Sequence, residues 1–175
     1  GGVTYWMGQS QFFTLSTSGV QPIECPVWDK VFQNLDKTNV RKIRCAPNSN
    51  FGEITWYYPS KNGGGEVDSY VKLSTFIGAP QGWDYGLLSR TAWVDQSGLG
   101  TPIGADGTNR LLFQHETSND ADGQAMHPVF QTGFFVLNEG DILTFVDQFV
   151  PDMKWGLDDG TSANAQVLLT FYVKA

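Results

Sequence analysis

Short apolar runs that alternate with polar residues recur along the chain at intervals of about ten residues. In EITWYYP (residues 53–59), Ile54, Trp56 and Tyr58 fall on one face of an extended chain, and the residues between them, Tyr57 included, fall on the other. A period of two residues is that of a β-strand, whose successive side chains point to opposite faces. The pattern therefore predicts a strand here with aromatic rings on at least one face.

A second run, VDSYVKLS (residues 67–74), has the same period and follows a proline and three glycines. Pro59 and the segment SKNGGG interrupt pairing between the two runs. We expect a long-looped hairpin over residues 51–74 in which Trp56 and Tyr58 pack on one side. Tyr57 faces the other way and is expected to tolerate substitution better.

The same pattern predicts twelve short strands along the chain: VTYWM, QFFTLS, VQPIE, KIRCA, EITWYYP, SYVKLS, YGLLSRTAWVD, PIGADG, RLLFQHE, FFVL, ILTFVDQFV and AQVLLTFYVKA.

One segment, PVWDKVFQNLD (residues 26–36), has a different period. Val27, Val31 and Leu35 repeat every four residues, and Pro26 suits the first turn of a helix. This spacing predicts a short connecting helix of about three turns.

The predicted fold class is all-β. Strand triplets separated by Asn, Asp and Gly recur roughly every forty residues, which favours propeller-like blades of short antiparallel strands, with a β-sandwich as the alternative. After His127 and Pro128 the apolar runs become longer. We expect a propeller-like β-blade region over residues 1–127 and a C-terminal, sandwich-like β unit over residues 128–175.

Composition agrees with a folded domain. The chain has 175 residues, of which 41% are hydrophobic and 14% aromatic, enough to bury a core. No run approaches the roughly 18 apolar residues that span a bilayer. The first residues, GGVTYWMGQSQ, lack the basic and apolar regions of a signal peptide.

The formal net charge of −7 makes the average field around the chain repel nucleic acid and anionic membranes. Sequence-specific DNA binding is therefore not expected. The spacing of Cys25 and Cys45 leaves both a disulfide and two free thiols open.

Residues with catalytic chemistry are few. His115 and Glu116 are neighbours in a predicted strand, so their side chains point to opposite faces and do not form a base with its orienting group. A structural or surface role is favoured for His115, and a loop position for His127 before Pro128. No nucleophile elbow, phosphate loop, zinc-protease helix or C-x-x-C pair occurs. We expect no catalytic, cofactor-binding or metal-binding residue and no enzymatic activity.

The acidic stretch SNDADGQAM (residues 118–126) has two interpretations. Asp120 and Asp122 are spaced as in the first half of a calcium loop, but no glutamate closes the twelve-residue motif. An Asx or Asp-Gly hairpin turn is therefore favoured. Asp106-Gly107 and Asp159-Gly160 are interpreted as turns for the same reason.

Trp83 and Trp93 suggest a glycan-binding surface, because exposed aromatic faces stack on sugar rings. The sequence alone leaves open whether these rings form such a platform or belong to the core.

An ordered series of segments resembles the tail proteins of short-tailed bacteriophages, the family called tail tubular protein B, tail nozzle or packaged-DNA stabilisation protein. The segments, which span nearly the whole chain, are YWMG (5–8), NSNFGEITWYYPS (48–60), DSYV (68–71), WDYGLLSRTAWVD (83–95), LLFQHETSNDADGQAM (111–126) and GDILTFVDQFVPDMKW (140–155). Members of the family are longer, so the resemblance implies a central-to-C-terminal portion of such a protein.

The resemblance implies a structural virion protein that assembles in the host cytoplasm as a homohexameric ring. Its implied partners are further copies of itself, the adaptor or head-tail connector, and tail fibre or spike proteins, with no cofactor and no small-molecule substrate. The implied role is to retain packaged DNA and to form the channel for its ejection, with non-specific passage of DNA. The negative charge fits a channel that does not grip phosphates. Two alternatives are a carbohydrate-binding or depolymerase-associated module of a phage tail and a secreted propeller hydrolase.

Overall fold

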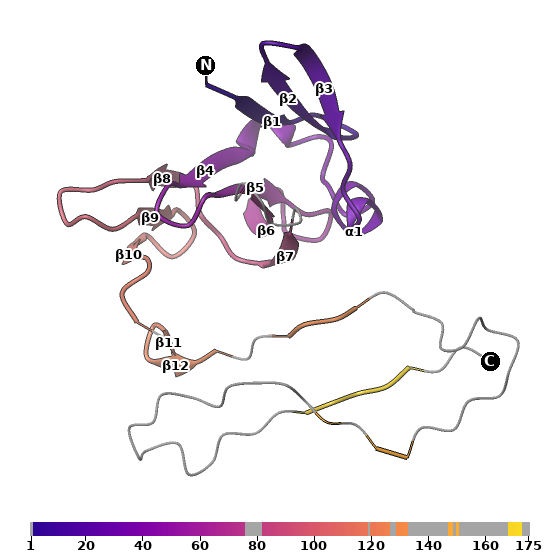
Figure 1. Cartoon of the computed structure of the whole chain (residues 1–175). Coiled ribbons are helices and arrows are strands. Elements are labelled where there is room, and N and C mark those ends of the chain that lie inside the picture. The colour runs from indigo at the N-terminus through magenta and orange to yellow at the C-terminus, as the bar shows by residue number, and fades with distance from the viewer. Residues whose placement is uncertain are drawn as a thin grey trace, which may run out of the picture. The chain divides into compact units, whose positions relative to one another are not determined.

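The computed structural model describes residues 2–75, 82–118, 120–126, 129–132, 147–148, 150 and 168–172. The chain divides into two compact units, Gly1–His127 and Pro128–Ala175. Every helix and strand of the described residues lies in the first unit (Figure 1).

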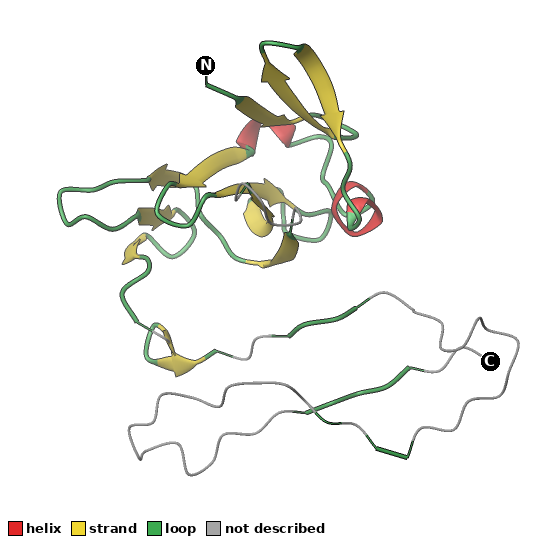
Figure 2. Ribbon diagram, viewed as in Figure 1, coloured by secondary structure: helices red, strands yellow, loops and turns green. Residues whose placement is uncertain are grey.

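Strands predominate in the first unit, and the only helical elements among the described residues are two short ones, α1 and η1 (Figure 2). In chain order the elements are β1 (Thr4–Met7), β2 (Phe12–Ser16), β3 (Gly19–Ile23), α1 (Trp28–Phe32), η1 (Val40–Lys42), β4 (Arg44–Asn48), β5 (Glu53–Pro59), β6 (Val67–Ser74), β7 (Trp83–Leu87), β8 (Ala92–Val94), β9 (Ile103–Asp106), β10 (Leu111–Gln114), β11 (Asp120–Ala121) and β12 (Gln124–Ala125).

All strand pairs among the described residues are antiparallel, and each sheet keeps the order of the chain. The sheets are β1-β2-β3, β4-β5-β6-β7, β8-β9-β10 and the hairpin β11-β12. Each is thus an up-and-down meander built from local connections. The all-β prediction is confirmed at this level.

The predicted hairpin is the centre of the four-stranded sheet. Strands β5 and β6 pair with Trp56 opposite Val71 and Tyr57 opposite Tyr70, and the register shifts by one residue between Tyr58 and Pro59. Paired residues share a face of a sheet, so Trp56 and Val71 lie on one face and the two tyrosines on the other.

The first face of this sheet carries the larger core, as the sequence predicts for Trp56 and Tyr58. Phe12 of β2 lies against Trp56 and Trp83, with ring centroids 4.8 Å apart in both pairs. The sheet β1-β2-β3 and helix α1 therefore cover this face. The buried residues of this core are Phe12, Ile23, Val31, Phe32, Leu35, Trp56, Tyr58, Val71 and Leu73.

The second face is also buried, and this corrects the expectation for Tyr57. Its side chain is only 4% exposed and packs in a smaller cluster with Ala46 and Val67. Trp93 of β8 covers it, with ring centroids 6.2 Å apart. The expectation failed because the two-residue period of a strand shows which residues share a face. It does not show whether one face or both faces are covered by other elements.

The helix prediction was wrong in length. Helix α1 has five residues rather than three turns, although Val31, Phe32 and Leu35 are all buried as their spacing indicates. Leu35 forms a β-bridge with Ser60, and the backbone N–H of Asp36 donates to the carbonyl of Pro59 at 3.0 Å. The chain leaves the helix early because these backbone groups pair with the end of β5.

The single strand predicted over residues 85–95 is two strands in different sheets, β7 and β8. The break includes Arg90, which is 6% exposed and hydrogen-bonded to the carbonyl of Ser89. Of the predicted C-terminal strands, 134–137 lies outside the described residues and 142–150 largely so. In the run 165–175, the described residues 168–172 belong to no strand.

The glycine-rich loop between β5 and β6 is held by specific contacts. The Asp68 carboxylate accepts hydrogen bonds from the backbone N–H of Ser60 at 2.8 Å and from its hydroxyl at 2.6 Å. A Cβ on Gly63 would overlap this carboxylate, so any other residue there would have to displace Asp68. Lys42 donates to the carbonyl of Gly65 at 2.7 Å and fastens the loop to η1. The loop is a docked structure rather than a loose link.

Candidate functional site

A cluster of charged and aromatic side chains surrounds Arg90, between β7 and β8. Arg90 Nε donates to Nε2 of His115 at 2.9 Å, and Nη1 donates to the Ser89 carbonyl at 2.7 Å. The guanidinium lies 4.3 Å from the ring centroid of Phe113, within the range of a cation–π contact. The ring of His115 lies 4.7 Å from that of Trp93. The cation thus contacts two rings, those of Phe113 and His115.

His115 is neutral in this arrangement. Burial, together with the charge of Arg90, lowers the pKa of His115 to about 4. Because Nε2 accepts from Arg90, the ring proton is on Nδ1. The Nε2 lone pair that a general base would use is already engaged. His115 therefore has a structural contact here, as the sequence favours.

The neighbours of this pair are fixed by other bonds. Glu116 follows the end of β10 with a φ of 59° and accepts from Asn48 Nδ2 at 3.1 Å, so His115 and Glu116 do not continue the strand as predicted. Burial alone would raise the pKa of Asp106, but hydrogen bonds from Asn109, Thr108 and Ser89 outweigh it and lower that pKa. The predicted turn at Asp106-Gly107 is confirmed by these bonds.

The acidic stretch forms a hairpin turn. Asp122 and Gly123 join β11 to β12 with φ values of 54° and 75°, the backbone of a type I′ turn that Asp-Gly favours. Asp120 Oδ1 accepts from the Ser118 hydroxyl at 3.0 Å and from the N–H of Gly123 at 3.1 Å. The hairpin-turn prediction is confirmed. Within the described ranges no three His, Cys, Asp or Glu side chains gather to hold a metal ion.

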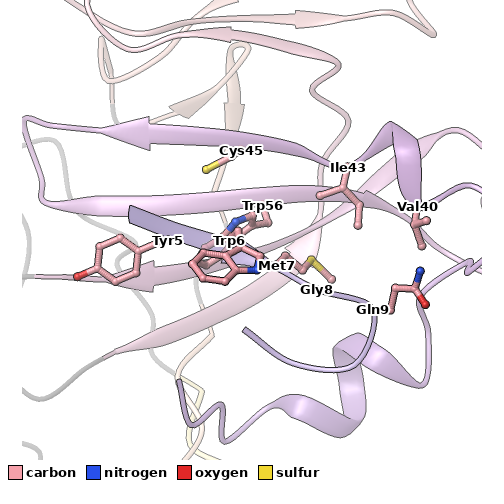
Figure 3. A pocket seen from close by; sticks show the side chains of 9 residues that line it. All are labelled: Tyr5, Trp6, Met7, Gly8, Gln9, Val40, Ile43, Cys45 and Trp56. Carbon is pink, nitrogen blue, oxygen red and sulfur yellow. The ribbon is translucent and has the colours of Figure 1, made fainter. Parts of the chain in front are cut away.

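A shallow hollow of about 360 Å³ lies between β1, η1 and the sheet β4-β7 (Figure 3). Its lining carries no charged side chain and consists of Tyr5, Trp6, Met7, Gly8, Gln9, Val40, Ile43, Cys45 and Trp56. Nε1 of Trp56 is buried and has no hydrogen-bond partner. The hollow offers mainly aromatic and aliphatic surface, with the Tyr5, Gln9 and Cys45 side chains as its polar groups.

Both cysteines are free thiols. Burial raises the pKa of Cys25 to about 11, with a smaller opposing effect from a hydrogen bond with the backbone of Val27. Burial also raises the pKa of Cys45, whose side chain lines the hollow. Raised thiol pKa values mean little thiolate at neutral pH, so neither thiol has the character of a nucleophile.

The tryptophans that suggested glycan binding are packed rather than displayed. Trp83 lies against Phe12 and Trp56, with centroids 4.8 and 6.3 Å away. Trp93 lies between Tyr57 and His115, and its Nε1 donates to the carbonyl of Pro47 at 2.7 Å. Both tryptophans are half-buried and their rings pack against other side chains of the chain, so of the two alternatives that the sequence left open the structure favours packing over a display platform.

His127, Asn119 and the turn at Asp159-Gly160 lie outside the described residues. Arg90 was not singled out from the sequence. A lone arginine in the polar stretch LSRT carries no periodic signal, and its partner His115 is 25 residues away.

Comparison with known proteins yields no relative: no family model, curated protein or solved structure matches the chain. No helix of the described residues has the length and apolar character needed to cross a membrane.

Proposed function

We propose that the chain is part of a structural protein of a short-tailed phage tail, a nozzle subunit that forms a ring with further copies of itself. In this role the ring retains packaged DNA and forms the channel for its ejection. The proposal starts from the six ordered segments that resemble this family, of which NSNFGEITWYYPS and WDYGLLSRTAWVD carry much of the aromatic core.

The observation that carries the proposal is the way three meanders pack in chain order. The sheet β4-β7 has β1-β3 on one face, through Phe12 and Trp56, and β8-β10 on the other, through Tyr57 and Trp93. Successive antiparallel sheets that pack face to face are the building principle of a propeller. We infer propeller-like blades on this basis.

Charge is distributed unevenly along the sequence. Residues 1–75 have seven basic and six acidic side chains, whereas residues 76–175 have four basic and twelve acidic ones. A ring needs heterologous contacts, in which one surface of a subunit meets a different surface of its neighbour. Unlike charge on two parts of the chain favours such contacts and sets their orientation. The acidic excess also suits a channel through which DNA slides.

The test is to determine the mass and the shape of the full-length protein with its adaptor, by native mass spectrometry and electron microscopy. The 175-residue chain measured alone is the comparison. We expect a hexameric ring from the full-length protein with a predominantly acidic channel. A stable full-length monomer that cleaves a polysaccharide, or a channel lined mainly by lysine and arginine, would rule the proposal out.

A further inference from the structure

The contact between the sheets β4-β7 and β8-β10 combines the small cluster around Tyr57 with hydrogen bonds between polar groups. We call this contact the seam, and it joins Pro47, Asn48, Ser49 and Tyr57 on one side to Trp93, Asp95 and Glu116 on the other. Ser49 donates to the carboxylate of Asp95 from its backbone N–H at 2.9 Å and from its hydroxyl. The hydrogen bonds from Asn48 and Ser49 are accepted by carboxylates, those of Glu116 and Asp95.

His115 supports the seam from behind Trp93. Its ring lies 4.7 Å from the Trp93 ring, which also packs against the cluster of Ala46, Tyr57 and Val67 and donates to the Pro47 carbonyl. The position of Trp93 thus depends on the His115 ring, and the position of that ring depends on its bond from Arg90.

The bond from Arg90 requires a neutral His115. A proton on Nε2 removes the acceptor and places two positive groups at the 2.9 Å separation of Arg90 Nε and His115 Nε2. The pair has no room to separate toward β9, since a Cβ on Gly104 would lie 2.6 Å from Arg90 Cδ and 3.0 Å from His115 Nε2. The backbone of β9 therefore closes one side of the pair.

The charge of Asp106 already acts on Arg90, and the carboxylates near the pair are hydrogen-bonded to other groups. Asp106 of β9 is bonded to Ser89, Thr108 and Asn109, and Glu116 is bonded to Asn48. From β5 the pair is faced by the neutral hydroxyl of Tyr57, and β8 and β10 present the rings of Trp93 and Phe113. No carboxylate among the described residues is hydrogen-bonded to His115 or to Arg90.

We propose that the seam is an acid-sensitive joint: protonation of His115 expels it from Arg90, frees Trp93 and loosens the sheet β8-β10 from the sheet β4-β7. The sheets β1-β3 and β4-β7 stay together, because Phe12, Trp56, Val71 and Leu73 in the core between them do not titrate. This joint is a conformational device of the fold and does not depend on the proposed function.

The direction of the pH dependence follows from the linkage between proton binding and the stability of the seam. The pKa of His115 is about 4 in the folded chain and is ordinarily 6.5, so the unfolded or opened form binds more protons between these values. The stabilisation is complete above pH 6.5 and is lost as the pH falls toward 4. The His115 ring is partly exposed, so solvent screening reduces this effect. We expect the equilibrium constant for opening of the seam to increase about ten-fold between pH 7 and pH 5.

Hydrogen exchange followed by mass spectrometry on the whole chain tests the joint, after correction for the intrinsic pH dependence of exchange. We expect peptides from residues 92–114 to lose protection about ten-fold at pH 5, while peptides from residues 53–74 do not. His115→Gln keeps an oxygen to accept from Arg90 but does not titrate, so most of the loss should disappear. His127→Gln is the matched control and should behave as the unmodified chain.

Three outcomes would overturn the joint: pH-independent protection of residues 92–114, parallel loss in both regions, or an unchanged loss in His115→Gln. If His115→Gln does not fold, His127→Gln leaves His115 as the only imidazole, and its NMR titration decides. A midpoint well below 6.5 supports the joint, and an ordinary midpoint contradicts it.

Discussion

Replacing Tyr57 with alanine tests whether both faces of strand β5 are buried. Trp56 is 1% exposed and Tyr57 is 4% exposed, and they point into different clusters. Truncation of a fully buried aromatic side chain costs about 3–5 kcal/mol. We expect Trp56→Ala and Tyr57→Ala to fall in this same range. For a chain of this length each kcal/mol lowers Tm by roughly 3 °C, so both variants should lose about 10–15 °C.

Two further variants separate burial from other effects. Trp56→Phe removes a buried Nε1 donor that has no partner, and relief of such a group offsets about 1–3 kcal/mol of the cost of lost volume. Trp56→Phe should therefore lower the free energy of unfolding much less than Trp56→Ala does. Leu87 is 82% exposed, and Leu87→Ala should change the free energy of unfolding by less than about 0.5 kcal/mol.

The measurement is denaturant unfolding followed by circular dichroism, with thermal scans as a second estimate. If Tyr57→Ala unfolds within about 0.5 kcal/mol of the unmodified chain while Trp56→Ala loses several, then only one face of β5 is buried in solution. That result would refute the face-to-face packing of β8-β10 on this sheet.

Three other perturbations follow from local geometry. Gly63→Ala should cost about 1–3 kcal/mol in urea unfolding, because its Cβ would overlap the Asp68 carboxylate, and an unchanged midpoint would contradict the docked loop. Millimolar calcium should leave Tm unchanged, because Asp120 already caps its own turn; a saturable rise that disappears in Asp120→Ala would show a site instead. Intact mass under non-reducing conditions should show two free thiols, and Cys25, with its pKa raised to about 11, should be alkylated roughly a hundred-fold more slowly at pH 8 than in urea. A disulfide between Cys25 and Cys45 would contradict the first expectation.

Local pattern was enough to predict the hairpin of β5 and β6. Strand β6 alternates strictly between buried and half-buried residues, β5 is rich in β-forming aromatic residues, and Pro59 and the glycines mark the connection, so the hairpin follows from a few neighbouring residues. The Asp-Gly turn between β11 and β12 was predictable for the same reason, because its backbone conformation selects those two residues. Both features depend on contacts that are close in sequence.

Features that depend on distant contacts were not predictable. Helix α1 ends early because Leu35 pairs with Ser60, and Tyr57 is buried because Trp93 covers it. In both cases the partner lies 25 or more residues away, and its position is set by the packing of whole sheets. Tertiary contacts override periodicity at such points.

The Arg90 and His115 cluster shows the same limit at the candidate site. The sequence favours a structural role for His115 but gives no partner for it, because the register of β8, β9 and β10 brings the two side chains together. A buried arginine between two strands is rare, and no residue spacing in the sequence predicts one.

The two faces of the central sheet differ in chemistry, and this difference bears on how the fold responds to its surroundings. The face toward β1-β3 is joined through Phe12, Trp56 and Leu73, whose side chains do not titrate and carry no charge that salt would screen. The face toward β8-β10 is joined through Asp95, Glu116 and the ring held by Arg90, whose contacts depend on protonation and are weakened by screening. The first junction therefore holds under any condition that leaves the core intact. The free energy of opening the junction with β8-β10 depends on pH and ionic strength. The sheet β4-β7 is therefore the fixed element against which β8-β10 can move.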